Sequence, residues 1–362
     1  MVKFRLYAGG WTAFIVSYLF DSETNQLTLE SRSPTGPSPS WLSLHPSDPS
    51  VLYTTNEYGP VGALQSFRIA ENGTLSLGDT TESGGNGPTY TERLSTGEVT
   101  ALNYGSPSFA IIPTSPDDPL QFSSDYRVVN VPVGAGQTSH PHHSLEYKDE
   151  LLVADLGMNT VWRVARDGKP GYWKIHGRLD SHPGAGPRHV AVIDDILFTM
   201  HEHDNTLTAR TIGAPGEQSP ILDTVTITPP TSPEGSVFAA AEILIPPKTD
   251  KFPTQHIYVS NRNIGVTDPK GDTIAIYSFD AETGKFTETA QVYTQLDQIR
   301  GMMFGQTENG GDEFIAASAN VVAQGETIKG GTIILKRVDG GANLEIVARN
   351  KDELTRTSLV WL

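Results

Sequence analysis

The chain has 362 residues, with 26 lysines and arginines against 42 aspartates and glutamates, and carries a formal net charge of −16. This acidity argues against non-specific nucleic-acid binding, which depends on neutralising phosphates with basic side chains. The chain contains no cysteine, which excludes disulfides, thiolate metal sites and a cysteine nucleophile.

The N-terminal residues 1–23 include an apolar stretch that Gly9, Gly10 and Thr12 interrupt. This pattern predicts two strands around a turn, not a signal peptide. No segment approaches the roughly 18 consecutive apolar residues that a membrane-spanning helix needs. We therefore expect a soluble monomer without membrane contact, secreted if it acts on a glycan and otherwise cytoplasmic.

Seven similar segments follow one another, each with short strands separated by turns rich in Gly, Asp, Asn and Pro. They cover residues 5–30, 39–77, 87–113, 141–168, 186–213, 238–289 and 299–347. Turns such as DSETNQL and AENGTL contain residues that tolerate positive φ at low cost. The repeat predicts an all-β fold, a seven-bladed β-propeller with four-stranded antiparallel blades, as a single domain over residues 1–362.

The two ends of the chain are expected to meet. The first segment is short of strands, and the final TSLVWL, residues 357–362, belongs to no segment. We predict that this strand pairs with the N-terminal strands and closes the ring, because an open ring would leave unpaired edges. The Pro-rich residues 227–236 are expected to form a loop between blades. A pair of β-sandwiches would need two copies and a visible linker, and is disfavoured.

Polar residues at the strand ends are the candidates for chemistry, because matching strand ends converge on one face of a propeller. Imidazole suits proton transfer, since its unperturbed pKa is about 6.5. The alternative for each histidine is a loop side chain bonded to the backbone. The candidate histidines are His142, His143, His189, His201 and His203. Clustered histidines also raise a zinc site, but no HExxH spacing is present and we predict no metal.

Arginines and acids complete the candidate set. Arg188, Arg262 and Arg300 follow turns or apolar strands and suit bidentate recognition of a carboxylate, although salt bridges to Asp155 or Glu242 would explain them equally. Glu202 stands between two histidines and is the preferred functional acid, while Asp155 is expected to be structural. Glu57 and Glu242 are further acids, the latter within an apolar strand.

Six motifs, taken in order, resemble the lactonase-type seven-bladed propellers, which include bacterial 6-phosphogluconolactonase and fungal carboxymuconate cyclase. The resemblance covers nearly the whole chain. The motifs are PSWLSLHPSDPSVLYTTNE, HPHH with VADLG, GPRHVAV, TMHEHDN, AEI with YVSNRN, and IRGMMF. The cyclases use a histidine, two arginines and a glutamate, which the motif positions match to His142 or His143, Arg188, Arg262 and Glu202.

One segment departs from the family pattern. The phosphogluconolactonase branch usually carries a Cys-His pair where this chain has Thr89 and Tyr90, which argues against hydrolysis of a phosphorylated lactone. Asn103 and Tyr104 are kept in the following strand. From the resemblance we expect Tyr104 to join the catalytic set. The residues expected to contact the substrate are His189, His201, His203, Asn103, Glu242, Arg300 and Tyr90.

The chain also resembles fungal L-rhamnose-α-1,4-D-glucuronate lyases, which trim rhamnose from gum arabic. Our main expectation is therefore a lyase that cleaves a terminal sugar–glucuronate linkage by β-elimination. Arginines would hold the uronate carboxylate, and histidine, Tyr104 or Glu202 would move protons. The alternative is a lactonase or carboxymuconate-type cycloisomerase acting on a sugar lactone or small organic acid. A noncatalytic scaffold is a third reading. No cofactor is predicted, and a structural cation in the central channel is conceivable but is not predicted.

Overall fold

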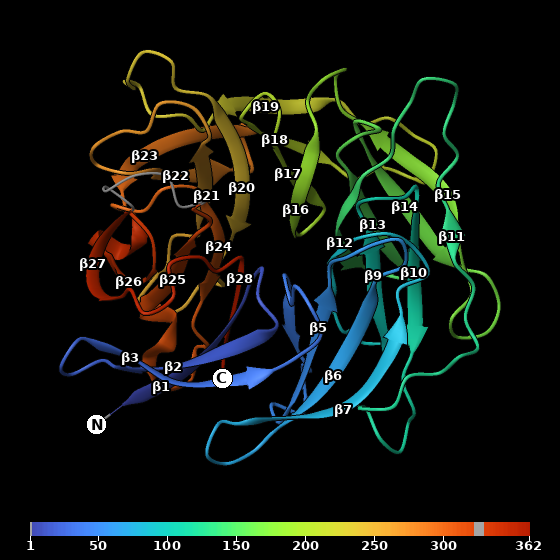
Figure 1. Ribbon diagram of the computed structural model, residues 1–362. Coiled ribbons are helices and arrows are strands. Elements are labelled where there is room, and N and C mark those ends of the chain that lie inside the picture. Colours follow the sequence, from blue (N-terminus) through green and yellow to red (C-terminus); the bar gives the residue numbers. More distant parts are fainter. Residues whose placement is uncertain (1, 322–328) are drawn as a thin grey trace.

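The described part of the computed structural model, residues 2–321 and 329–362, forms seven four-stranded antiparallel sheets arranged as the blades of a ring (Figure 1). The predicted seven-bladed β-propeller is confirmed. Residues 322–328, within the last predicted segment, lie outside the described residues. No helix in the described ranges is long and apolar enough to cross a membrane.

The first three blades each run from an innermost strand at the channel to an outermost strand at the rim. In that order their strands are β28 (Ser358–Trp361), β1 (Lys3–Gly9), β2 (Phe14–Asp21) and β3 (Gln26–Pro34); β4 (Leu42–Leu44), β5 (Val51–Asn56), β6 (Ala63–Ile69) and β7 (Leu75–Glu82); and β8 (Pro88–Tyr90), β9 (Glu98–Asn103), β10 (Ser108–Pro113) and β11 (Val129–Asn130).

The other four blades follow the same plan. Their strands are β12 (Pro141–Tyr147), β13 (Glu150–Asp155), β14 (Thr160–Arg166) and β15 (Trp173–Asp180); β16 (Pro187–Ile193), β17 (Ile196–His201), β18 (Thr206–Thr211) and β19 (Ile221–Thr226); β20 (Phe238–Leu244), β21 (His256–Asn263), β22 (Thr273–Asp280) and β23 (Lys285–Tyr293); and β24 (Ile299–Phe304), β25 (Phe314–Ala319), β26 (Thr332–Val338) and β27 (Asn343–Asn350). Two short 3₁₀ turns, η1 (Glu308–Glu313) and η2 (Asp339–Gly341), lie in the last blade.

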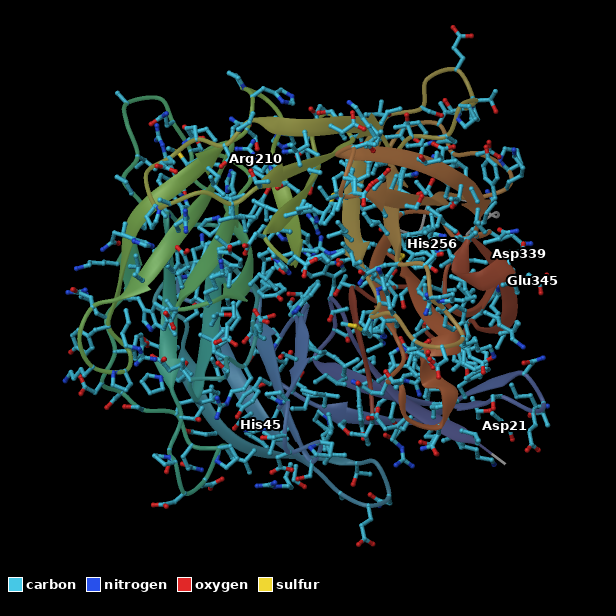
Figure 2. All side chains as sticks on the ribbon, turned by 180° about the vertical axis from the view of Figure 1, so that it is seen from behind. Asp21, His45, Arg210, His256, Asp339 and Glu345 are labelled. Atoms are coloured by element: carbon cyan, nitrogen blue, oxygen red, sulfur yellow. The ribbon has the colours of Figure 1, made fainter. Side chains whose placement is uncertain are left out.

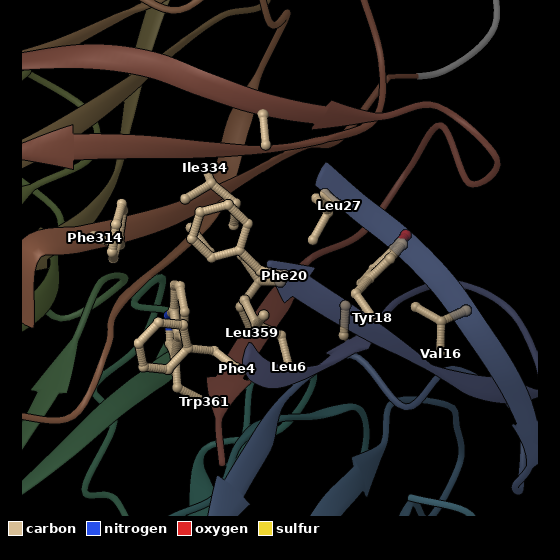
Figure 3. Close-up of a cluster of buried hydrophobic side chains, with 13 residues drawn as sticks. Phe4, Leu6, Val16, Tyr18, Phe20, Leu27, Phe314, Ile334, Leu359 and Trp361 are labelled. Carbon is tan, nitrogen blue, oxygen red and sulfur yellow. The ribbon is translucent and has the colours of Figure 1, made fainter. Parts of the chain in front are cut away.

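The C-terminal strand closes the ring, as predicted. β28 pairs antiparallel with β1, so that Tyr7 lies opposite Val360, and it supplies the strand that the first segment lacks. Aromatic rings fill the space between the first and last blades (Figure 3). Phe20 meets Phe314 edge-on with ring centroids 5.0 Å apart, and Phe4 meets Trp361 at 5.8 Å. The closing strand is therefore held by packing as well as by backbone hydrogen bonds.

The predicted turns lie between the outer strands of the blades. Asn25, between β2 and β3, has a φ of 54°, and Gly73, between β6 and β7, has a φ of 82°. The Pro-rich residues 227–236 connect β19 to β20, as expected. Acidic side chains such as Asp339 and Glu345 lie exposed at the outer edge of the ring (Figure 2), so part of the net negative charge lies away from the channel.

Candidate active site

A break in strand pairing recurs at the start of the innermost strands. In β8, β12, β16 and β24 the pairing with the next strand shifts by one residue near the strand's beginning. Such a bulge leaves one residue unpaired and redirects its side chain. The four unpaired residues are Thr89, His142, Arg188 and Arg300, and all of them line a single cavity of about 200 Å³. The bulge is thus the local feature that turns one residue of each of these four blades into the cavity.

The second strands of the blades supply the remaining walls. Glu57, Tyr104 and Glu202 each come directly after a second strand, β5, β9 and β17 respectively, and all three line the cavity. Arg262, one residue before the end of β21, completes the lining. Strand starts and strand ends that are far apart in sequence therefore meet at one face of the ring.

Three residues expected to contact substrate have other surroundings. Side chains alternate along a strand, so the residue next to a cavity-lining residue points the other way. The side-chain amide of Asn103 donates to the Ser83 carbonyl oxygen at 3.2 Å. His201 is buried beside the hydroxyl groups of Ser181 and Thr206, at 3.0 and 3.2 Å. His203 is exposed. Proximity in sequence to Tyr104 and Glu202 therefore does not bring these three side chains into the cavity lining.

Glu202 bridges the two arginines that the sequence singled out. One carboxylate oxygen lies 2.5 Å from Nη1 of Arg188, and the other lies 2.9 Å from Nη2 of Arg262. Both guanidinium groups are also fixed by backbone carbonyl oxygens: Arg188 Nε donates to Ala241 and Arg262 Nε to Ala239. These arginines are therefore held in place without any ligand.

The arginines of the cavity have one hydrogen-bond donor and one positive charge that no group in the described ranges pairs with. Nη2 of Arg188 is buried and has no hydrogen-bond partner, which costs about 1–3 kcal/mol unless a ligand supplies one. Arg300 lies 4.0 Å from the carboxylate of Glu57 and under the ring of Trp11, with its guanidinium carbon 4.8 Å from the ring centre. Three guanidinium groups thus face the two carboxylates of Glu57 and Glu202, leaving one positive charge for an anionic ligand.

The protonation states follow from burial and from these charges. Burial alone would raise the pKa of Glu202, but the attraction of Arg188 and Arg262 outweighs it and lowers the pKa to about 2. Burial and the neighbouring Arg188 lower the pKa of Arg262 to about 10, so it stays charged at neutral pH. Burial raises the pKa of Tyr104, which keeps its hydroxyl protonated.

The histidines form a layer beside the cavity. His142 lines the cavity, whereas His143 stacks on His189 and packs against Tyr90, with both ring centroids 4.5 Å away. Nδ1 of His142 lies 3.2 Å from Nε2 of His189, and Nδ1 of His189 lies 3.0 Å from a carboxyl oxygen of Glu242. Glu242, His189 and Tyr90 were all expected to contact the substrate, but none of them lines the cavity. Glu242 and His189 are connected to it through His142, whereas Tyr90 packs against His143.

Asp155 fixes the loop that presents His142. Its carboxylate accepts hydrogen bonds from the Ser139 hydroxyl at 2.6 Å, the His140 backbone N–H at 2.8 Å and Trp162 Nε1 at 3.0 Å. The ring of His140 in turn stacks on Tyr104 with a centroid separation of 4.3 Å. This matches the structural role expected for Asp155, and it ties the orientation of two cavity residues to one buried acid.

Two cavity residues were given no role in the site by the sequence. Glu57 was noted as an acid but was given no role, and Thr89 was noted only as a departure from the family pattern. The signal for Thr89 is present, since it follows a proline at a strand start just as His142 and Arg188 do. Within the described residues, no group of three or more His, Asp or Glu side chains is arranged to hold a metal ion.

The comparisons with known proteins agree with this architecture. The family model for the lactonase 7-bladed beta-propeller matches residues 5–318. The chain belongs to this lactonase family. No curated protein sequence matches the chain at a significant level.

Solved structures with the same fold are distant in sequence. A Lactobacillus plantarum protein superimposes with a TM-score of 0.81 at 19% identity over 100% of both chains. A putative 6-phosphogluconolactonase from Bacteroides fragilis gives 0.79 at 19% identity, covering 99% of this chain and 98% of that one. The periplasmic gluconolactonase PpgL of Pseudomonas aeruginosa gives 0.79 at 18% identity, covering 100% and 99%. At this identity the likeness concerns the fold alone.

Proposed function

We propose that this lactonase-family protein is an enzyme that opens or closes a lactone ring on a small organic acid or sugar acid with a free carboxylate. The observation that carries the proposal is Arg188, with its unused Nη2, beside His142 in the wall of one small cavity. Family membership supports this alternative better than the glucuronate lyase that was our main expectation.

Formation of a lactone from an unsaturated acid requires that a proton is added to the carbon next to a carboxylate, and the reverse reaction requires that this proton is removed. When a carboxylate adds to an alkene and forms a lactone, negative charge develops on the neighbouring carboxylate until its carbon is protonated. Guanidinium groups stabilise that charge in a site that excludes water. Arg188 and Arg300 can take this role, and His142 can supply or remove the proton. Hydrolysis of a lactone would use the same groups, with His142 activating a water molecule.

The size of the cavity favours a small substrate. A cavity of about 200 Å³ is smaller than the roughly 300–1,000 Å³ typical of sites for drug-sized ligands. The end of a polysaccharide side chain would have to extend out of the mouth. The absence of the Cys-His pair at Thr89 and Tyr90 speaks against a phosphorylated lactone, in contrast to the names of some structural neighbours.

The test is a substrate panel followed by NMR in D₂O. Sugar lactones, muconate-type dienoic acids and a rhamnosyl-glucuronic acid are each incubated with the protein. Addition places deuterium on the carbon next to the carboxylate and elimination removes the hydrogen from that carbon, whereas hydrolysis opens a lactone and leaves that hydrogen in place. An unsaturated uronate from the third substrate would support the lyase instead. No turnover of any lactone or dienoic acid would contradict the proposal.

Variants decide whether the cavity is responsible for the activity. Arg188→Ala should lower kcat/KM by roughly 100-fold or more, because removing one oxyanion-stabilising donor costs about this much. Arg262→Ala should lower it as well, because Arg262 and Arg188 share the carboxylate of Glu202. Arg68→Ala is the matched control, since Arg68 lies on β6, the third strand of its blade, in a partly exposed ion pair with Asp48. Equal activity in the cavity variants and the control would show that another site acts.

A further inference from the structure

Three buried side chains from three consecutive blades form a continuous chain of hydrogen-bonding groups. Glu242 in β20 lies 3.0 Å from Nδ1 of His189 in β16, and Nε2 of His189 lies 3.2 Å from Nδ1 of His142 in β12. Each of the three residues is only 2% exposed. Of the three, His142 lines the cavity. The chain therefore connects a carboxyl group behind the wall to an imidazole in the wall.

Ring packing fixes the position of His189, the middle residue of this hydrogen-bonding series. The His189 ring stacks on His143 at 4.5 Å and meets Trp41 edge-on at 5.3 Å. Glu242 has one further carboxyl oxygen, Oε1, which is buried without a hydrogen-bond partner. Its 3.0 Å contact with Nδ1 of His189 is therefore the contact through which this carboxyl group can pass a proton. The geometry is suited to passing a proton along one defined path.

A neutral His142 needs such a path if it is to act as an acid. Burial and the nearby Arg188 lower the pKa of His142 well below its ordinary value, so the imidazole is neutral at neutral pH. A neutral imidazole that releases its Nε2 proton becomes an anion unless Nδ1 receives a proton in the same step. Burial lowers the pKa of His189 in the same way, so His189 is not the source.

The proton can come from Glu242. Burial raises the pKa of this carboxyl group to about 8, although the attraction of Arg188, Arg300 and Arg262 opposes the shift. The carboxyl group therefore carries its proton at neutral pH and donates a hydrogen bond to His189. A buried carboxyl group with a raised pKa next to a cavity is a recurring feature of proton-transfer sites.

We propose that Glu242 is the proton store of the site and that His189 relays its proton to His142. The substrate step rests on the proposed function, whereas the relay concerns side chains of the protein alone. Glu242 and His189 are positioning residues that act through His142, which is the group that meets the substrate.

The step balances in protons and charge. His142 gives its Nε2 proton to the substrate carbon and takes the Nε2 proton of His189 on Nδ1. His189 takes the carboxyl proton of Glu242 on its own Nδ1. Both imidazoles end neutral, and the negative charge that had developed on the substrate is replaced by one on the Glu242 carboxylate. Solvent in the cavity then protonates Nε2 of His142, and the two inner transfers run backwards, so that Glu242 regains its proton and both imidazoles regain their first tautomer. Ring opening by elimination uses the transfers in reverse, starting from the Glu242 carboxylate.

The decisive variant is Glu242→Gln. A glutamine amide can still donate a hydrogen bond to Nδ1 of His189, but it has no proton to release. We expect kcat to fall by roughly 100-fold, within the usual contribution of general acid–base catalysis, while KM stays within about twofold. The wild-type proton inventory in H₂O/D₂O mixtures should be curved, because several protons move together, and the variant should lose that curvature.

Glu92→Gln is the matched control. Glu92 is a half-buried carboxyl group in the wall of another pocket, with a pKa that burial raises to about 8, and it accepts a hydrogen bond from the Ser144 hydroxyl and none from the histidines. The control should keep kcat within about twofold. If Glu242→Gln does not fold, His189→Gln interrupts the same chain and is expected to show the same loss.

A second measurement does not depend on the substrate. Nitrogen-15 NMR of the histidines should find the proton on Nε2 in both His142 and His189, with each Nδ1 accepting. The opposite tautomers in the resting protein would overturn the proposal, as would a kcat unchanged in Glu242→Gln or a loss confined to KM. If no substrate turns over at all, the proposed function fails and the tautomers alone decide the relay.

Discussion

Glu202→Gln is the sharpest test of the electrostatics of the cavity. The substitution keeps the shape of the side chain but removes the carboxylate that lies between Arg188 and Arg262. The pKa of Glu202 falls from an ordinary value of 4.5 to about 2, which corresponds to about 3 kcal/mol in the free energy of unfolding at neutral pH. The side chain is only 17% exposed, so solvent screening reduces this little.

The pH dependence has a definite sign. Because the folded-state pKa is depressed, the stabilisation is present above pH 4.5 and is lost as the pH falls towards 2. The variant has no carboxylate to protonate at this position. The difference in the free energy of unfolding between wild type and variant should therefore decrease as the pH falls and Glu202 is protonated in the wild type. It should be about 3 kcal/mol at pH 7 and about 2 kcal/mol at pH 3.5.

Urea denaturation of both proteins at the two pH values measures this difference. Glu30→Gln is the control, because Glu30 forms a partly exposed ion pair with Arg5 and should cost less than about 1 kcal/mol. A cost for Glu202→Gln below that of the control at pH 7 would refute the reasoning. A cost that does not decrease at pH 3.5 would refute it equally, since the loss would then not come from the charge.

Three further predictions concern the closure of the ring by β28, the role of Asp155 in positioning the loop of His142, and the placement of His201 outside the cavity. Truncation before Ser358 removes the innermost strand of the first blade and should cost at least about 5 kcal/mol, because four buried residues are lost; thermal denaturation measures it. Asp155→Ala removes the acceptor of four hydrogen bonds, and chemical denaturation should show a cost of about 3 kcal/mol. His201→Ala should change kcat/KM far less than His142→Ala, and equal losses in the two variants would contradict the placement of His201 outside the cavity.

Much of the fold is visible in the sequence because it rests on local rules. Alternating apolar residues and turns with Asn or Gly mark the strands, and counting strands predicts that the last one closes the first blade. The features that escaped are those without a local pattern. β11 has only two residues, Val129 and Asn130, which are too few to show an alternation of apolar and polar side chains. The 3₁₀ turn η1 lies in a segment rich in Gly and Glu that reads as a loop.

The face of the ring that carries the site was predictable, but the direction of each side chain was not. Strict alternation would turn Arg188 and His189 to opposite sides of β16. The bulge removes that constraint, so that Arg188 lines the cavity while His189 contacts His142, another member of the same site. A bulge depends on how two strands pair, so it cannot be recognised from the amino-acid sequence of a single strand. Sequence reasoning therefore found the right segments and misjudged some neighbours within them.

The two kinds of position divide the chemistry between them. The bulges of the innermost strands supply two cations and an imidazole, and the ends of the second strands supply two acids, a phenol and the third cation, Arg262. The four bulges lie in four different blades, so a substitution at one bulge changes the cavity without altering the strand pairing of the others. Thr89 occupies such a bulge and is uncharged. A cation there would leave two positive charges unbalanced, whereas threonine leaves one, which fits a substrate bound through a single carboxylate.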